Sequence, residues 1–419
     1  MNLFSSGKSY LGVDIGTSAV KIVELEDKGG KAKLVTYGYV EQPTDVVRSS
    51  SSEMEANIVK IIKQICSDSR TKSKKVVASL PSFSVFSSII NLPKMKRKDL
   101  EQAIKWEAKK FVPLPIEEMV LDWKIVPDNP ERNTDSKKQL KDNFSHSGLK
   151  SSQGLNKKDK LSSQTSKSNS GNVIKEEKIE KNTQKNGIFN KILSSTQKHS
   201  SSANESKDEN IKILLTAAPK NLVERYIKIF KSASLEILSL ETESFALERA
   251  LVGYDPSAVM IVDIGSVSSD MVIINNNIPM LTRSVDVGGA TITKALMDNL
   301  NVDLERAEQF KRDIGFSATG KGDLPELIKE SINPIINEIK YSLDIFLSQD
   351  DSQPIDKIIL TGGSAWLPEL SGFLAKLLDS RVIVGDPWDR VVYPLELKPV
   401  LSEIGPRFSV AIGLAMRPI

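Results

Sequence analysis

Cysteine and histidine are almost absent from this chain of 419 residues. Cys66 is the only cysteine, so neither an intrachain disulfide nor a zinc site built on cysteines can form. The two histidines, His146 and His199, both lie in one polar stretch of the sequence. A Ser-His-Asp triad or a histidine-ligated metal centre would have to be built from that stretch, which argues against both kinds of enzyme.

Long apolar runs are also missing. No stretch approaches the roughly 18 apolar residues of a membrane span, and residues 1–10 lack the apolar core of a signal peptide. We therefore expect a cytoplasmic protein with no direct membrane insertion. The net charge is only +3, from 57 basic and 54 acidic residues, so we expect no nucleic-acid partner.

One segment differs in composition from the rest. Residues 129–209 are rich in Ser, Lys, Asn and Gln, and bury too little apolar surface to offset the entropy of ordering. We expect a disordered polar insert. A short apolar patch at 187–193 could be a transient helix or a partner motif, but a solvated loop is the favoured interpretation.

The flanking sequence has the pattern of a folded α/β protein. Alternating and continuous apolar runs predict strands, and apolar residues at helical spacing predict helices. The expected strands lie within 10–27, 31–42, 74–81, 84–93, 211–219, 257–277 and 357–366. The expected helices lie at 53–69, 98–111, 222–233, 291–299, 304–314, near 327–348, 368–378 and 408–415.

Two of these hairpins share one order of residues: a strand, Asp, Ile, Gly, hydroxyl residues, then a second strand. The glycine allows a tight turn and close approach to an anion, and the following N–H and hydroxyl groups form an anion-binding concavity. One copy alone fits an ordinary hairpin; two copies favour a clamp on one polyphosphate. The clamp residues are Asp14, Gly16, Thr17, Ser18 and Lys21 in the first copy, and Asp263, Gly265, Ser266 and Ser268 in the second.

The two aspartates also indicate a metal ion. A carboxylate beside a phosphate is repelled unless a cation lies between them, so Asp14 and Asp263 predict Mg²⁺, held through water molecules. The sequence contains neither a G-x-x-x-x-G-K-[ST] motif nor a G-x-G-x-x-G motif after a strand. P-loop and Rossmann sites are therefore excluded.

Two further motifs are compatible with an adenosine site. A buried strand ends at Gly362, Gly363 and Ser364, where a base or ribose could lie against the backbone. Glu308 and Lys311 are three residues apart on an expected helix and share a face, so they could hold ribose and base. An ordinary surface ion pair explains the same spacing equally well.

In this order the motifs resemble the nucleotide signature of the actin-like ATPases, which include actin, MreB, FtsA, sugar kinases and heat-shock chaperones. Within that superfamily the chain is similar to the PilM family of type IV pilus assembly proteins. The resemblance is carried by 3–25, 79–95, 100–123, 240–251, 260–274, 286–296, 307–315 and 360–370.

The resemblance implies an α/β fold of the actin-like, ribonuclease H-like kind. It is a duplicated nucleotide-binding fold with a small inserted subdomain of the FtsA/PilM type. The expected parts are 8–75 with the first phosphate loop, 76–128 and 210–235 as the small subdomain, the insert at 129–209, and 236–419 with the second phosphate and adenosine loops.

The resemblance also implies cofactors and residue roles. ATP and Mg²⁺ are the expected cofactors, with Gly288 and Gly289 in loops near the nucleotide. An acid on the helix that begins after residue 240 would orient the attacking water. Glu243 matches that place best and Glu241 is the fallback, although a plain surface glutamate is the favoured alternative. We expect at most a slow ATPase.

The expected function is that of an adaptor in the inner-membrane platform of a type IV pilus. It would bind the cytoplasmic N-terminal peptide of PilN in a nucleotide-sensitive way and, through it, the PilN/PilO complex at the inner face of the cytoplasmic membrane. Pilus motor ATPases and a homo-oligomer are further expected partners. The alternatives are an FtsA/MreB-like filament and a small-molecule kinase, for which the sequence offers no general-base aspartate.

Overall fold

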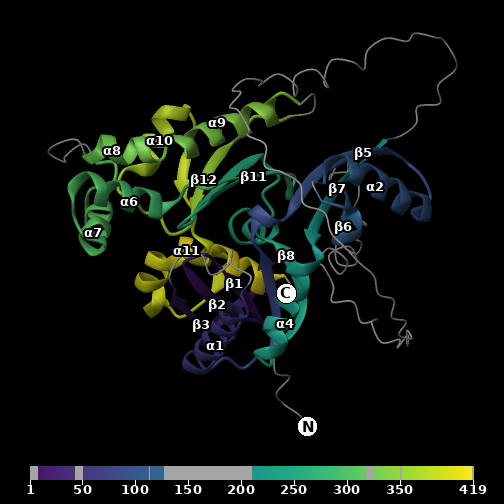
Figure 1. Ribbon diagram of the computed structural model, residues 1–419, viewed down its shortest axis with the longest axis horizontal. Coiled ribbons are helices and arrows are strands. Elements are labelled where there is room, and N and C mark those ends of the chain that lie inside the picture. The colour runs from purple at the N-terminus through teal and green to yellow at the C-terminus, as the bar shows by residue number, and fades with distance from the viewer. Residues whose placement is uncertain are drawn as a thin grey trace, which may run out of the picture. The chain divides into compact units, whose positions relative to one another are not determined.

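The computed structural model describes residues 8–42, 51–112, 114–126, 210–317, 324–349 and 352–417 (Figure 1). The expected disordered insert at 129–209 lies outside these residues. In the described part of the chain the strands form sheets of six, five and three strands.

The six-stranded sheet begins with an antiparallel meander and continues with parallel strands. In spatial order its strands are β14 (Val391–Val392), β3 (Ala32–Glu41), β2 (Ala19–Asp27), β1 (Ser9–Ile15), β4 (Lys75–Leu80) and β8 (Glu236–Thr242). Helices α1 (Ser52–Asp68) and α4 (Lys220–Ser232) pack apolar residues against β1 and β4. In α1 these are Ile58, Ile61, Ile62 and Ile65, a helical spacing that places them on one face.

The five-stranded sheet repeats the same topology. Its spatial order is β11 (Ile278–Val285), β10 (Ser269–Asn275), β9 (Val259–Ile264), β12 (Lys357–Thr361) and β13 (Val382–Val384). As in the first sheet, an antiparallel meander is followed by a strand that pairs parallel to its first member. The helices of this half are α6 (Gly289–Leu300), α7 (Leu304–Ile314), α8 (Leu324–Ser331), α9 (Asn333–Leu347) and α10 (Leu370–Leu378).

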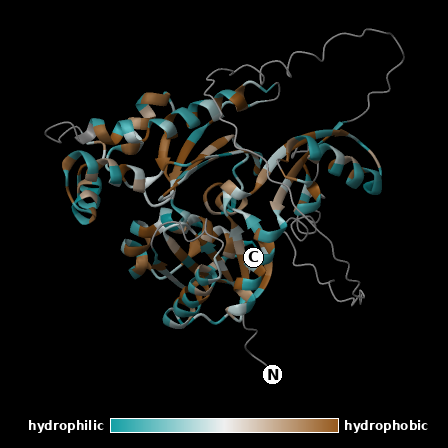
Figure 2. Cartoon of the chain, viewed as in Figure 1, coloured by the Kyte–Doolittle hydropathy of each residue, from teal (hydrophilic) through white to brown (hydrophobic). Residues whose placement is uncertain are grey.

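Strand β9 is apolar from Val259 to Val262 because both of its faces are buried, and Asp263 interrupts this run near the end of the strand. Met260, Val262 and Ile264 join the core beneath the outer helices, whereas Val259 and Ile261 join the core on the opposite face. Figure 2 shows the resulting pattern: the inner strands are hydrophobic, and the outer helices carry both hydrophobic and hydrophilic residues.

Helix α11 (Lys398–Met416) lies between the two large sheets. It contacts β1, β2, β4 and β12, together with the short helix α5 (Glu243–Leu247) and the following π-helical stretch Glu248–Val252. Short helices at Pro387–Arg390 and Leu395–Leu397 precede it. Within the described ranges, neither α11 nor any other helix is long and apolar enough to cross a membrane.

A small subdomain is built on the three-stranded sheet. Its strands are β5 (Phe86–Pro93), β7 (Asn210–Pro219) and β6 (Met119–Val126), all antiparallel. Helix α2 (Arg97–Phe111) covers one face with Leu100, Ile104 and Ala108. The short helix η1 (Ser82–Ser84) leads into β5, and η2 (Ile116–Glu118) leads into β6.

The boundaries of this small subdomain are narrower than the ranges expected from the sequence. Strand β4 lies in the six-stranded sheet, and α4 packs into the core of that sheet with Val223, Tyr226 and Phe230. We therefore propose that the small subdomain consists of 86–126 and 210–219 rather than 76–128 and 210–235.

Candidate functional site

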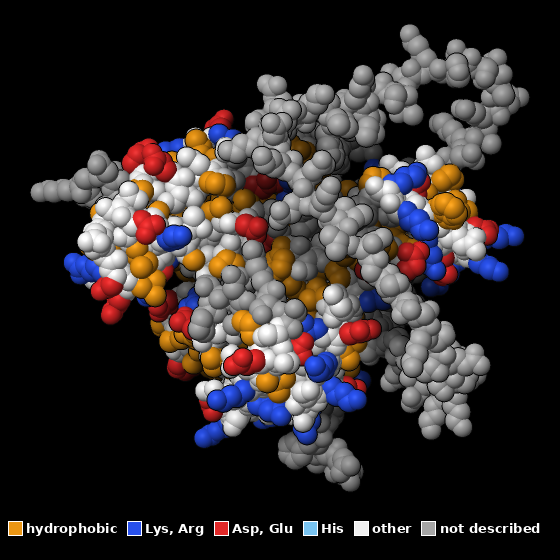
Figure 3. Space-filling view, viewed as in Figure 1, with side chains coloured by type: hydrophobic (Ala, Val, Ile, Leu, Met, Phe, Trp, Pro, Cys, Tyr) orange, Lys and Arg blue, Asp and Glu red, His pale blue; other side chains and the backbone are white. Residues whose placement is uncertain are grey.

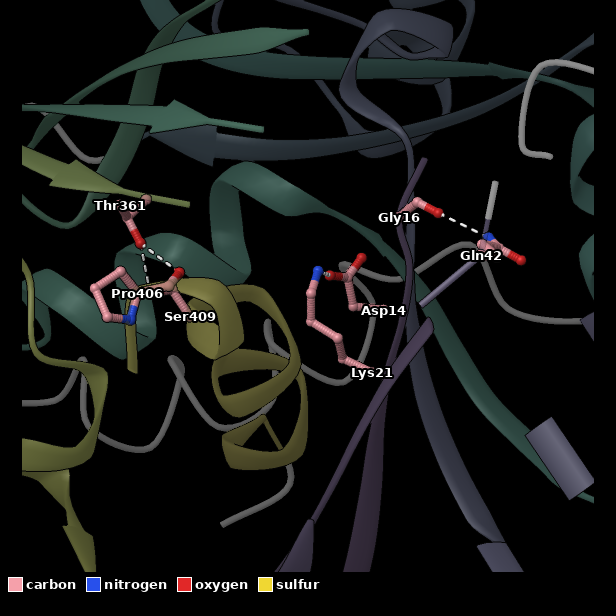
Figure 4. A network of polar contacts seen from close by, with 7 residues as sticks. All are labelled: Asp14, Gly16, Lys21, Gln42, Thr361, Pro406 and Ser409. Carbon is pink, nitrogen blue, oxygen red and sulfur yellow. Dashed lines mark hydrogen bonds and ion pairs between the residues drawn. The ribbon is translucent and has the colours of Figure 1, made fainter. Parts of the chain in front are cut away.

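The first hairpin places a carboxylate and an amine side by side. Asp14 is the penultimate residue of β1 and is paired in register with Lys21 on β2. The Lys21 Nζ donates a hydrogen bond of 2.8 Å to Asp14 Oδ2, and both side chains are largely buried (Figure 4). Asp14 therefore has a counter-charge within its own hairpin.

The loop of this hairpin is closed by a residue that the sequence motif does not contain. Gly16 donates its N–H to the Ala19 carbonyl at 3.0 Å. Its own carbonyl accepts a bond of 3.1 Å from Gln42 Nε2, and the Gln42 N–H bonds to the Ser18 carbonyl at 2.9 Å (Figure 4). Thr17 and Ser18 are partly exposed at the tip, so their hydroxyls are accessible to an anion.

The second hairpin has the same register as the first, but the residue paired with its aspartate is acidic instead of basic. Asp263 is the penultimate residue of β9 and pairs with Asp270 on β10, in the position that Lys21 holds opposite Asp14. Burial and then the Asp270 charge raise the pKa of Asp263 to about 7, although Lys21 lowers it. Burial raises the pKa of Asp270 to about 6, against a hydrogen bond from Ser284.

Asp270 was not among the residues predicted from the sequence. The signal was present, because Asp270 follows Asp263 by the same interval as Lys21 follows Asp14. In a tight hairpin this interval returns the chain to a position beside the first strand's last residue. Asp270 is therefore part of the candidate site.

The glycines of the second loop allow two backbone segments to touch. Gly289 donates its N–H to the Gly265 carbonyl at 2.9 Å, and a Cβ on Gly288 would lie 2.6 Å from both the Gly265 and Ser266 carbonyls. Gly265 also donates its N–H to the Ser268 carbonyl at 3.0 Å. The start of α6 is thus seated directly on the second phosphate loop.

The third loop packs against the second. Gly362 has a φ of +88°, and a Cβ there would lie 2.3 Å from Asp263 Oδ1. Ser364 donates its N–H to the Ile264 carbonyl at 3.3 Å, and its Oγ would lie 2.6 Å from a Cβ on Gly289. Gly363, by contrast, has open space, with only Arg407 at 4.0 Å from such a Cβ.

The same loop is tied to α11. Gly362 donates its N–H to the Pro406 carbonyl at 3.0 Å, and Thr361 Oγ1 donates to that carbonyl at 2.9 Å. Ser409 Oγ lies 2.6 Å from Thr361 Oγ1 and also donates to Pro406 (Figure 4). The central helix therefore fixes the third loop.

Glu308 and Lys311 belong to a buried network rather than to an exposed ion pair. The Lys311 Nζ donates to Glu308 Oε1 at 2.7 Å, to Thr293 Oγ1 at 2.8 Å and to the Gly289 carbonyl at 3.2 Å. Burial lowers the pKa of Lys311. Burial by itself would raise the pKa of Glu308. The hydrogen bonds from Lys311 and Thr293 outweigh this effect, so the pKa of Glu308 is lowered. The pair anchors α7 to the start of α6.

Of the two candidate acids after residue 240, only one shares the electrostatic environment of the hairpin aspartates. Glu243 begins α5, and its pKa is raised well above the ordinary value by burial and by the charges of Asp270, Asp14 and Asp263. Glu241 is buried and forms ion pairs with Arg249 and Arg417. Glu241 therefore has a structural role, whereas Glu243 lies with the candidate site.

These residues fit a magnesium nucleotide. The charges of Asp14 and Asp270 raise the pKa of both Asp263 and Glu243, and Lys21 is the cation that opposes this at Asp263. A divalent ion would relieve that repulsion. Among the described residues no three acids, histidines or cysteines are close enough to coordinate a metal together. Phosphate oxygens and water would therefore have to complete its coordination.

Two large sheets of one topology, each with an aspartate-glycine hairpin loop, define the actin-like class of α/β proteins, and the expected fold class is confirmed. The model of the family described as type IV pilus assembly protein PilM matches residues 12–141 and 197–419. The chain belongs to this family, as the sequence motifs predicted.

Among the known proteins that are similar to the chain are a solved pilus complex and a cell division protein. The solved PilM-PilN type IV pilus biogenesis complex matches with a TM-score of 0.69 and 24% identity, over 97% of this chain and 98% of that one. Cell division protein FtsA of Bacillus subtilis (strain 168) is 23% identical over an alignment of 194 residues, and the match covers 41% of this chain. The match spans 44% of the length of that relative.

Proposed function

We propose that this protein is an ATP-binding adaptor that holds the cytoplasmic N-terminal segment of PilN at the inner-membrane platform of a type IV pilus. Membership of the PilM family and likeness to a PilM-PilN complex support the adaptor role. The observation that carries the nucleotide role is the packing of the second phosphate loop, the start of α6 and the Gly362 turn into one continuous cradle.

Each loop of the cradle has a role in the proposed binding. The backbone N–H groups and hydroxyls of Thr17, Ser18, Ser266 and Ser268 would donate to phosphate oxygens. Asp14 and Asp263 would accept hydrogen bonds from water bound to Mg²⁺, with Asp270 behind them. The ion, when bound, neutralises the charge between these carboxylates and the phosphates.

The adenosine part would lie against the third loop. We propose that Gly362, Gly363 and Ser364 leave space for it, and that Glu308, Lys311, Gly288 and Gly289 define its other wall. We also propose that Glu243 orients water for attack on the γ-phosphate. Hydrolysis would be slow at most, because Glu243 is already engaged by Ser82.

The small subdomain offers a groove for the PilN segment. Its apolar floor consists of Trp106, Ile116, Met119 and Leu121, and Trp106 is 72% exposed. Lys105, Lys109 and Lys220 also line the groove and outnumber the one acid of the lining, Glu117. Lys220 is the first residue of α4, so the groove reaches the junction with the first large sheet. In Figure 3 basic and hydrophobic side chains lie close together on this part of the surface.

Binding to PilN would place the protein at the inner face of the cytoplasmic membrane. Through PilN it would join the PilN/PilO complex. Contacts with pilus motor ATPases and self-association are further expectations of the family resemblance.

Calorimetric titration of the full-length chain tests both parts of this proposal. We expect Mg·ATP to bind, and Asp263→Asn to weaken it at least about tenfold, or about 1.4 kcal/mol. Asp344→Asn, at an exposed position on α9, is the matched control and should bind normally. Absence of nucleotide binding by the wild-type chain would contradict the nucleotide part.

The second titration uses a synthetic peptide of the PilN N-terminal segment from the same organism. We expect Trp106→Ala to weaken peptide binding, because aromatic anchors in a groove carry much of the binding energy. Tyr254→Ala removes an aromatic side chain that is 93% exposed and should have no effect. If the wild-type chain does not bind the peptide, the adaptor role is wrong.

A further inference from the structure

Three consecutive residues of α5 contact three different parts of the molecule. Glu243 Oε2 accepts hydrogen bonds from the Ser82 N–H at 3.1 Å and from the Ser82 hydroxyl at 2.5 Å. Ser244 Oγ lies 3.0 Å from Thr282 Oγ1 on β11. Phe245 packs in an apolar cluster with residues of the three-stranded sheet and of β11. A helix of five residues therefore links the candidate nucleotide site to the small subdomain.

Ser82 lies where the small subdomain leaves the large sheet. It begins η1, between β4 of the six-stranded sheet and β5 of the three-stranded sheet. The other connection between these sheets is the junction of β7 and α4 at Pro219 and Lys220. Both η1 and β5 also contact β11. A shift of η1 relative to α5 would therefore tilt the sheet that carries the groove.

Glu243 is arranged to respond to what the two phosphate loops bind. Oε2 takes both bonds from Ser82, and among the described residues none donates a hydrogen bond to Oε1. The charges of Asp14, Asp263 and Asp270 all act on this carboxyl group. A cation and phosphate between those aspartates would change the field at Glu243, and ordered water there could bond to Oε1.

We propose that Glu243 and Ser82 form the joint through which the bound nucleotide sets the position of the small subdomain and the affinity of its groove. This inference rests on the proposed function. Ser82 is a positioning residue that acts through Glu243. The hydrogen bonds of Ser82 would be stronger in one nucleotide state than in the other, and that difference is the coupling between the two sites.

The test is the ratio of PilN-peptide dissociation constants measured with Mg·ADP and with Mg·ATP on the full-length chain. We expect the wild-type ratio to differ from one by about tenfold, within the usual range of allosteric coupling. Ser82→Ala should bring the ratio close to one because it removes the hydroxyl bond. Ser82→Thr, which keeps both donors, should restore it.

The matched control is Ser84→Ala, in the same turn, because the structure gives Ser84 no hydrogen bond to Glu243. This variant should keep the wild-type ratio. Ser82→Ala combined with Glu243→Gln should bring the ratio no closer to one than Ser82→Ala alone, because the two residues act as one unit. Thermal unfolding of each variant confirms that it is folded.

Two results would overturn the inference. One is a folded Ser82→Ala variant with the wild-type ratio. The other is a wild-type ratio of one while both ATP and peptide bind, which leaves the proposed function intact. Absence of ATP or peptide binding by the wild-type chain instead contradicts the proposed function itself.

Discussion

At the scale of single residues, Lys21 and Asp270 hold equivalent places in the two hairpins. Each is the cross-strand partner of the aspartate that stands next to last in the first strand of its hairpin. One neutralises its aspartate with a bond of 2.8 Å, and the other adds a second negative charge. The duplicated backbone thus carries an uneven charge, and the second hairpin is the one that benefits most from a cation.

This uneven charge has a consequence for stability in the absence of nucleotide. The pKa of Asp263 is raised from its ordinary value of 3.8 to about 7, so the folded protein holds a proton that the unfolded chain has released at intermediate pH. The free energy of unfolding should therefore fall as pH rises from about 4 to about 7. Asp263→Asn should flatten this dependence, as measured by urea unfolding without divalent ions.

Asp344→Asn is again the control and should keep the wild-type slope, because this side chain is exposed on α9. An Asp263→Asn variant with the same slope as the wild type would show that the second hairpin does not hold the proton.

Sequence alone could identify the residues of the motifs but not all their partners. Asp14, Asp263 and the glycines were predicted because each loop needs those residue types in that order. Gln42 and Ser82 could not be predicted, since they contact Gly16 and Glu243 across 26 and 161 positions of the chain. Such contacts exist only after the sheets have assembled.

At the scale of elements, close backbone approach explains two glycines around α11. A Cβ on Gly12 of β1 would lie 2.0 Å from the Ala411 carbonyl, and one on Gly413 would lie 1.9 Å from the Ala246 carbonyl. The helix can therefore lie directly against β1 on one side and α5 on the other. A side chain at Gly12 would force α11 away from β1, and one at Gly413 would force it away from α5.

We expect Gly413→Ala to destabilise the protein by about 3 kcal/mol, the upper part of the range for overpacking. Gly372→Ala is the matched control, because Gly372 is also helical and a Cβ there would come no nearer than 3.4 Å to Glu369. That variant should be neutral or more stable by up to about 1 kcal/mol. Denaturant unfolding compares the two, and equal stabilities would contradict the packing described.

The elements that were predicted best have both a clear pattern and clear ends. Helix α7 begins after the capping residue Asp303 and ends before Gly315, as the pattern predicted. The single long helix expected near 327–348 is two helices, because Pro334 cannot continue α8 and instead lies in the first turn of α9.

Helix α11 was predicted only in part. It was expected at 408–415 but begins at Lys398 and contains Pro406. Because it is buried on several sides, it lacks the one-sided periodicity that marks a surface helix. Strands β13 and β14 have only three and two residues, too few for a pattern.

At the scale of the whole molecule, the duplication of one topology is what brings the two motifs into one site. In each large sheet, the first strand of the antiparallel meander leads into the same kind of aspartate-glycine loop. Helix α11 packs between the two sheets. The sequence predicted this duplication from the repeated hairpins. It could not predict that α5 would connect the site to the small subdomain, because that helix has no distinctive pattern of its own.

Hydrogen–deuterium exchange of the full-length chain, with and without Mg·ATP, tests the central claim that both hairpins hold one nucleotide. We expect slower exchange in both loops, around 14–18 and 263–268, at the same concentration of Mg·ATP. Protection of only one loop, or of neither loop at saturating Mg·ATP, would contradict it.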